Sequence, residues 1–130
     1  MPLNRSIREL TQRLKAAKSK LIFATTTPVP PGTLGRVAGD EKIYNQVAFE
    51  VMKELDVPID DLCAYVAEQQ KKVPPRPLSE LPTPPQRTKL QPGEIQQPFN
   101  VHFSTEGYDQ LANLVVASIA KAEKVLTAPH

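Results

Sequence analysis

The sequence lacks most of the features that assign a protein to a special compartment or to a polymeric partner. Cys63 is its only cysteine, so no internal disulfide can form and a reducing compartment is favoured. Its 16 basic and 14 acidic residues give a net charge of +2, without a run of one sign suited to nucleic acid or anionic membrane. The start of the chain has no apolar signal region, and the longest largely apolar run, residues 114–120, is too short to span a membrane. We therefore expect a cytoplasmic protein that binds neither nucleic acid nor a membrane.

Several chemical signatures are missing as well. There is no glycine-rich phosphate loop, no Cys/His zinc cluster, no nucleic-acid motif and no internal repeat. A length of 130 residues with 40% hydrophobic residues predicts a single domain, residues 1–130, with a modest core. Function must therefore be sought in single residues and short segments.

The sequence does contain an alternation of helical and strand patterns. Four segments place apolar residues at helical spacing behind a capping Ser, Asp or Thr: residues 6–18, 40–55, 61–72 and a longer one from Ser104 or Thr105. Residues 21–26 and 57–59 are short apolar, β-branched runs that predict buried parallel strands, although Pro58 weakens the second.

Two of these helices carry an apolar stripe along one face. In the second helix the stripe consists of Ile43, Val47, Val51, Met52 and Leu55. In the last helix it consists of Leu111, Leu114, Val115, Ile119 and Ala122.

Residues 74–98 form a proline-rich segment within the domain. Eight prolines lie among polar residues there, which removes backbone donors and favours extended conformations. We expect a long surface loop. Disorder is the alternative, unless the apolar residues of the segment attach it to a core, namely Leu78, Leu81, Leu90 and Ile95.

The order helix, strand, helix, strand, helix, loop, helix predicts an α/β fold with right-handed parallel crossovers. Two parallel strands leave unpaired edges and half-covered faces, which such sheets normally bury under further elements. We therefore expect the chain to complete its sheet by association, as a homodimer or a larger homo-oligomer.

Three segments resemble parts of the SGNH (GDSL-type) hydrolases: residues 20–29, with a strand ending in Thr-Thr-Thr-Pro-Val, residues 40–65, and residues 100–111. The most specific motif is His-Phe-Ser-Thr-Glu-Gly-Tyr at 102–108, a histidine just ahead of a capped helix. The resemblance implies the C-terminal part of a flavodoxin-like, three-layer α/β domain that begins after its third strand. It also implies that His102 is the catalytic base.

Other parts of the family pattern are absent. The family takes its nucleophilic serine from a Gly-Asp-Ser block, and its oxyanion donors from that serine, a glycine and an asparagine, and none of these blocks occurs here. The family also places an aspartate three residues before the histidine, where this chain has Phe99, and Asn100 is the nearest polar neighbour. Phenylalanine can neither accept the Nδ1 proton nor stabilise imidazolium. The family's acyl-serine mechanism therefore cannot run in its usual form.

A metal ion could replace the missing parts. Glu106 and Asp109 follow His102 by four and seven residues, so a helix begun near Ser104 could present all three on one side. Imidazole and carboxylates suit a divalent ion such as zinc or manganese, which would turn bound water into a nucleophile. The alternative is that these acidic residues serve the helix dipole and that His102 is an inherited surface residue.

Other residues are candidates for contacts with the substrate or for nucleophilic attack. Arg36 could stabilise charge on phosphoryl oxygens, and Thr26 and Asn100 could contact the substrate beside His102. Cys63 and Ser104 could be proposed as nucleophiles, but a small buried residue and a helix cap are the simpler interpretations.

These residues predict a hydrolase that uses a metal to cleave a phosphoester (monoester or diester) or another ester. Two alternatives remain: a catalytically silent fragment that acts as an interaction module, and a carboxylesterase with an unrecognised serine. Pairing of two chains would duplicate every ligand and could assemble a site that one chain lacks.

Overall fold

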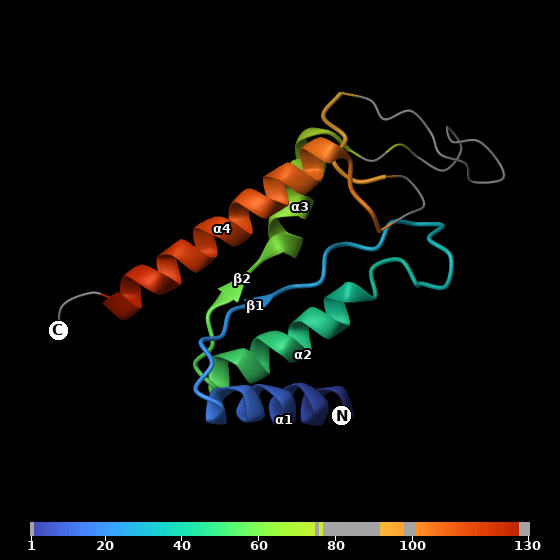
Figure 1. The fold of residues 1–130 in the computed structure, drawn as a ribbon. Coiled ribbons are helices and arrows are strands. Elements are labelled where there is room, and N and C mark those ends of the chain that lie inside the picture. Colours follow the sequence, from blue (N-terminus) through green and yellow to red (C-terminus); the bar gives the residue numbers. More distant parts are fainter. Residues whose placement is uncertain (1, 75, 77–91, 98–100, 128–130) are drawn as a thin grey trace.

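A computed structural model of the chain contains four helices and a small parallel sheet (Figure 1). It describes residues 2–74, 76, 92–97 and 101–127. In chain order the elements are α1 (Pro2–Ala16), β1 (Phe23–Ala24), α2 (Glu41–Glu54), β2 (Ile59–Asp60), α3 (Leu62–Lys72) and α4 (Thr105–Thr127). The predicted α/β class and the order of the elements are confirmed. Within the described residues, no helix is long and apolar enough to cross a membrane.

The sheet consists of β1 and β2, which pair in parallel as predicted, with Phe23 opposite Ile59. The amides of Phe23 and Thr25 donate to the carbonyls of Pro58 and Asp60 at 2.9 and 3.1 Å. Pro58 has no amide proton, yet its carbonyl still accepts, so it lies at the entry to the strand rather than within it. No third strand joins this sheet in the described part of the chain.

One hydrophobic cluster lies between the sheet and the pair α1 and α2, which are stacked in Figure 1. Val51 and Met52 of α2 are 0% and 2% exposed, and burial of such side chains stabilises the fold by about 1.5–3 kcal/mol each. Val57 is also buried there, and several partly buried side chains pack around it: Ile7, Leu21, Phe23, Leu55 and Ile59. This cluster fixes β1 and β2 on the first helical layer.

A second hydrophobic cluster joins α3, α4 and the segment before α4. Its buried members are Val66, Ile95, Phe103 and Leu111, with Leu62, Tyr65 and Leu114 packed against them. In Figure 1, α3 and α4 lie on the opposite side of the strands from α1 and α2. The two clusters thus give the chain a helix, strand, helix layering.

The starts of α3 and α4 are capped as the sequence predicts. The Asp61 carboxylate accepts a hydrogen bond from the Ala64 amide. The Ser104 hydroxyl accepts from the Gly107 amide at 3.0 Å. Each bond satisfies an amide that the helix itself leaves without a partner, so both elements begin at a fixed residue.

The proline-rich segment is fastened where it leaves and rejoins the described chain. Arg76 makes two hydrogen bonds to Glu94, at 2.7 and 3.0 Å, and these side chains are only 15% and 6% exposed. Gly93 has a φ of 86°, and an added Cβ would lie 2.7 Å from Val73, so only glycine fits. Ile95 is buried, as its possible core role predicts, whereas Leu78, Leu81 and Leu90 lie outside the described residues.

The two predicted apolar stripes are only partly buried. In α2, Val47, Val51 and Met52 are buried, but Ile43 is 62% exposed. In α4, Leu111 is buried while Ile119 is 50% exposed. A sheet of two strands covers too little of either helix to bury the whole of its apolar stripe.

Candidate functional site

His102 lies on a short loop that folds back on itself ahead of α4. Gln96 and Phe103 form an antiparallel bridge. The Gln97 amide donates to the His102 carbonyl and the Ser104 amide donates to the Ile95 carbonyl, both at 2.8 Å. These bonds fix the backbone on both sides of His102 while its side chain stays exposed.

Gln96 attaches this loop to the carboxyl end of β1. Its side-chain amide donates to the Pro28 carbonyl at 2.7 Å, and its oxygen accepts from Gln70 at 3.0 Å. Gln96 is only 8% exposed, so the two bonds are shielded from water. The loop that carries His102 is thereby held beside the segment that follows β1, on the side of the sheet where open α/β folds bind ligands.

The His102 ring contacts Tyr108, a residue in the first turn of α4. Its Nδ1 lies 3.1 Å from the Tyr108 hydroxyl oxygen. The Tyr108 ring packs edge-on against the buried Phe103, with ring centres 5.8 Å apart and planes at 63°. The sequence reasoning missed Tyr108. Its position four residues after a capping Ser104 was the available signal, because that spacing brings the first helical turn back toward the preceding loop.

The proposed metal ligands do not gather around His102. Glu106 and Asp109 are both exposed, and a Glu106 oxygen accepts a hydrogen bond from Gln110 at 3.2 Å. Among the described residues, no three His, Cys, Asp or Glu side chains come close enough together to hold a metal ion. His102, Glu106 and Asp109 therefore do not form a ligand set within this chain.

Arg36 is held by a carboxylate. Its Nε and Nη2 donate to the two Asp40 oxygens at 3.3 and 2.9 Å, and this hydrogen bonding raises the pKa of Arg36. Asp40 makes no cap hydrogen bond with its side chain, so its predicted role as the cap of α2 was wrong. The carboxylate that would cap α2 instead faces the guanidinium one helical turn earlier in the chain.

The threonines after β1 differ sharply in their surroundings. The Thr25 side chain is buried, and its hydroxyl donates to an Asp61 oxygen at 3.0 Å while it accepts from the Cys63 amide at 2.9 Å. Thr26 is exposed, but Asn45 pairs with both its backbone amide and its carbonyl. Thr25 therefore fastens β1 to the start of α3, whereas Thr26 is exposed to solvent.

The buried polar network extends into α2. Glu41 and Asn45 are 4% and 6% exposed, and a Glu41 oxygen accepts from the Val29 amide at 3.2 Å. The sequence reasoning missed both residues, because polar positions near the start of a predicted helix normally face solvent. Their partners are backbone groups of the loop after β1, and the spacing of apolar residues along a helix does not predict such contacts.

The two nucleophiles considered from sequence are occupied or protonated. Partial burial, followed by the nearby Glu41 and Asp61, raises the pKa of the Cys63 thiol, which keeps it in the weakly nucleophilic form. The Ser104 hydroxyl caps α4. Both observations agree with the simpler interpretations, a small partly buried residue and a helix cap.

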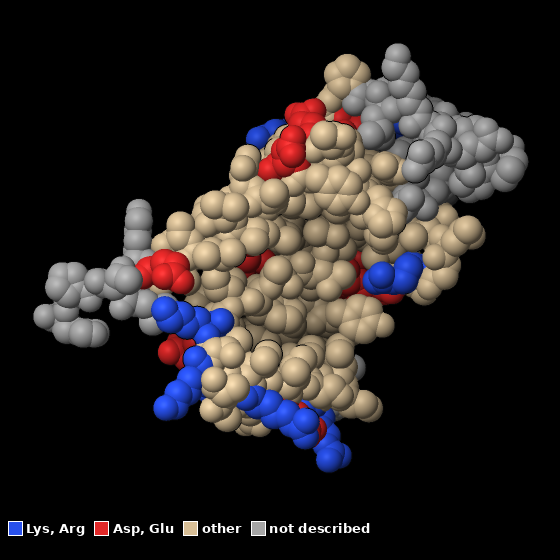
Figure 2. All heavy atoms as spheres, viewed as in Figure 1, with Lys and Arg blue, Asp and Glu red and all other residues tan. Residues whose placement is uncertain are grey.

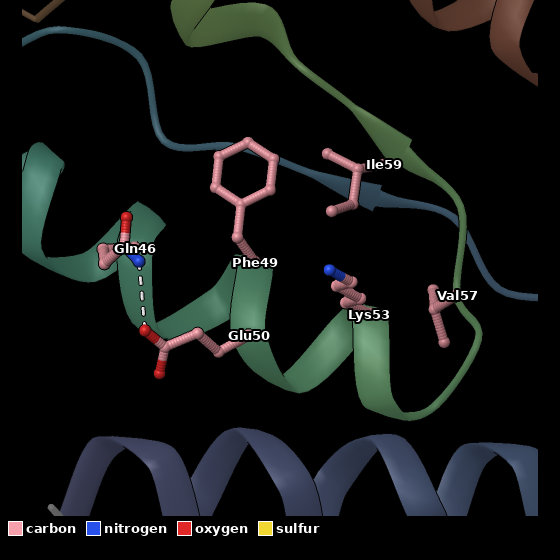
Figure 3. A pocket seen from close by; sticks show the side chains of 6 residues that line it. All are labelled: Gln46, Phe49, Glu50, Lys53, Val57 and Ile59. Carbon is pink, nitrogen blue, oxygen red and sulfur yellow. Dashed lines mark hydrogen bonds between the residues drawn. The ribbon is translucent and has the colours of Figure 1, made fainter.

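A shallow hollow lies elsewhere, between α2 and β2 (Figure 3), and none of the predicted site residues lines it. Phe49 points from α2 toward the strands, while Gln46 and Glu50 bond to each other at 3.0 Å. Figure 2 shows Lys and Arg side chains gathered along the α1 edge of the molecule, with a largely uncharged surface above it. The remaining predicted contact residue, Asn100, lies outside the described residues.

Comparison with known proteins adds no relative to these observations. No protein-family model matches the sequence, and a search of curated proteins finds no match. The functional argument therefore rests on the geometry around His102 and on the resemblance carried by the three segments.

Proposed function

We propose that the chain carries the histidine of an SGNH-like ester hydrolase, in a flavodoxin-like layer completed by association with a second chain. The observation that carries the proposal is the position of His102. It stands exposed on a loop whose backbone is fixed by two hydrogen bonds and which Gln96 attaches to the segment after β1.

In this function His102 is the general base. It removes a proton from the attacking hydroxyl and returns it to the leaving alkoxide, so that the ester bond breaks without a free hydroxide or alkoxide. The hydroxyls of Thr25 and Ser104 are taken up by Cys63 and Gly107. Neither of these two hydroxyls is then available as the nucleophile, and we propose water or a hydroxyl from the associated chain as the attacking group.

The open side of the sheet supports the association. Because parallel pairing directs alternate backbone groups to opposite edges, the amide and carbonyl of Ala24 face away from β2. No described strand pairs with that edge. On α1, Leu10 and Leu14 are 60% and 41% exposed, as expected for a helix that lacks part of its sheet.

A metal-assisted route, with a phosphoester as substrate, is the more specific form of the proposal. The described residues of one chain do not assemble ligands for it, so the ion would need donors from the associated chain. Chelation is the direct test of this route.

The test is hydrolysis of p-nitrophenyl acetate and bis(p-nitrophenyl) phosphate by the purified protein, with and without EDTA. We expect His102→Ala to lower kcat/KM at least 100-fold, because general base catalysis contributes about 10²–10⁴-fold. His130→Ala, at the chain's other histidine, is the matched control and should leave kcat/KM unchanged. Full activity in His102→Ala would overturn the proposal. Activity that survives EDTA would remove only the metal-assisted form.

The exposed apolar side chains favour a second candidate function, a catalytically silent module that pairs with another copy of itself. Besides Leu10 and Leu14 on α1, Val116 and Ile119 on α4 are 64% and 50% exposed. Light scattering should then show a dimer that Leu10→Lys weakens. A monomer at every concentration would contradict this candidate.

A further inference from the structure

We infer that Tyr108 is the positioning residue of His102, an inference that rests on the proposed function. Its hydroxyl accepts the Nδ1 proton and so fixes the tautomer in which Nε2 is the basic nitrogen. Phe99, at the position where the resemblance calls for a carboxylate, can make no such bond. Tyr108 approaches from the opposite direction along the chain, from the helix that follows His102.

The Tyr108 hydroxyl is held in place by contacts on both sides of the histidine loop. Its oxygen lies 3.1 Å from His102 Nδ1, within hydrogen-bond distance. Its ring stands edge-on to Phe103, which is 5% exposed and belongs to the core. The Tyr108 amide donates to the Ser104 carbonyl at 2.9 Å, which joins its backbone to the loop. The contact between the His102 and Tyr108 rings is therefore supported by the core and by the backbone of the loop.

Gly107 brings α4 close enough for this contact. An added Cβ at Gly107 would fall inside van der Waals contact of the Ile95 carbonyl, so the first turn of α4 lies directly on the strand-like segment before His102. Residues 95–97 and 101–104 and the helix start thus form one unit. The distance between His102 and Tyr108 is set by this unit rather than by their side chains alone.

The chemistry of a phenol suits the role. A tyrosine hydroxyl can accept one hydrogen bond while it donates another. It can fix the tautomer and the orientation of the ring, as a carboxylate does. It carries no full negative charge, so it stabilises imidazolium less than a carboxylate would. Tyr108 would therefore control the direction of proton transfer more than its driving force.

The experiment is a measurement of the His102 tautomer by long-range ¹H–¹⁵N NMR, with His102 assigned through His130→Ala. In the wild-type protein we expect neutral His102 to carry its proton on Nδ1. In Tyr108→Phe, which keeps the ring against Phe103, the proton should move toward Nε2, the form that free imidazole side chains prefer. Tyr44→Phe is the matched control, because Tyr44 is 45% exposed on α2, and it should leave the tautomer unchanged.

Kinetics provide the second readout. We expect Tyr108→Phe to lower kcat about tenfold with KM unchanged, the effect of losing one hydrogen bond that orients the base. A wild-type proton on Nε2, or a tautomer that Tyr108→Phe does not alter, would overturn the inference even if the protein hydrolyses esters. If wild-type protein shows no hydrolysis, the proposed function fails, and the tautomer still decides whether Tyr108 positions His102.

Discussion

Two groups of polar side chains lie around the carboxyl end of the sheet, and they are built in opposite ways. The threonine rim, formed by Thr25, Glu41, Asn45 and Asp61, is mostly buried, and hydrogen bonds between these residues and nearby backbone groups occupy it. The histidine loop, of which the structure describes residues 95–97 and 101–104, is fixed through the backbone of these residues and leaves the His102 side chain exposed. The sequence makes His102 the first candidate and Thr26 a possible substrate contact, and burial distinguishes the rim, which folding constrains, from the exposed His102 side chain.

The difference has an energetic reason. A buried polar group whose partner is removed costs about 1–3 kcal/mol, so the rim residues are constrained by folding. An exposed imidazole has no such constraint, because water replaces any lost partner. Variants of the rim should therefore change stability, and variants at the tip of the loop should change activity.

The largest effect on stability should come from Gly107→Ala, which separates the histidine loop from the first turn of α4. The added methyl group meets the Ile95 carbonyl, a backbone atom that cannot turn aside, so α4 must move off the loop. We expect a loss of about 3 kcal/mol in the free energy of unfolding, measured in urea. Gly35→Ala is the control, since its site is open and only its positive φ opposes alanine, at about 1 kcal/mol. Equal stability of both variants would show that the loop is not docked on α4.

A smaller effect should follow from removing one hydroxyl of the rim. Thr25→Val keeps the shape of the side chain but leaves the Cys63 amide without its acceptor and removes one of the two hydrogen bonds that Asp61 accepts. We expect the free energy of unfolding to fall by about 2 kcal/mol. Thr26→Val, one residue along and exposed, should change it by less than about 0.5 kcal/mol. Similar values for the two threonines would abolish the distinction between rim and surface.

The smallest effect should be found at an exposed ion pair far from both groups, Arg8–Glu54 at 2.6 Å. The hydrogen bond from Arg8, and then its charge, lower the pKa of Glu54. Because the folded pKa lies below the unfolded one, the pair stabilises the fold above the ordinary glutamate pKa, and this stability is lost as the pH falls through the lowered value.

Glu54→Gln should therefore destabilise the protein slightly at neutral pH, by less than Thr25→Val, and not at all in strong acid. Added salt should shrink the difference, since both side chains face water. Thermal unfolding at several pH values measures it. A loss that persists in acid would mean that the pair contributes through packing rather than charge.

The sequence predicted the features that local patterns determine. The order of the helices and the caps at Asp61 and Ser104 follow from apolar spacing and from side chains that satisfy free amides, whereas α1 begins at Pro2, so the predicted cap at Ser6 was wrong. The strands turned out shorter than predicted, because only Phe23 and Thr25 donate across the pair before the chain reaches Pro28. Ile43 is exposed although it lies on the apolar face of α2, because α2 extends beyond what two strands can cover.

The site was predicted less completely, because its contacts join segments far apart in the chain. The resemblance singled out His102 and the rim of the sheet, and the bond from Gln96 to Pro28 supports that position. The pairing of Thr25 with Cys63 and the contact of His102 with Tyr108 depend on how separate elements approach one another. The spacing of residues along the chain cannot predict how separate elements pack together. For the same reason it suggested a ligand set of His102, Glu106 and Asp109 that the described residues do not assemble.

The ion pair between Arg76 and Glu94 has a consequence for changes in the length of the chain. It closes the two ends of the segment 77–91 at a point before the histidine loop begins, so changes of length inside that segment need not be transmitted to His102. Loop closure becomes more costly only slowly with length, by about 0.6 kcal/mol for each doubling. A peptide tag inserted between Arg76 and Glu94 should therefore leave the position of His102 unchanged.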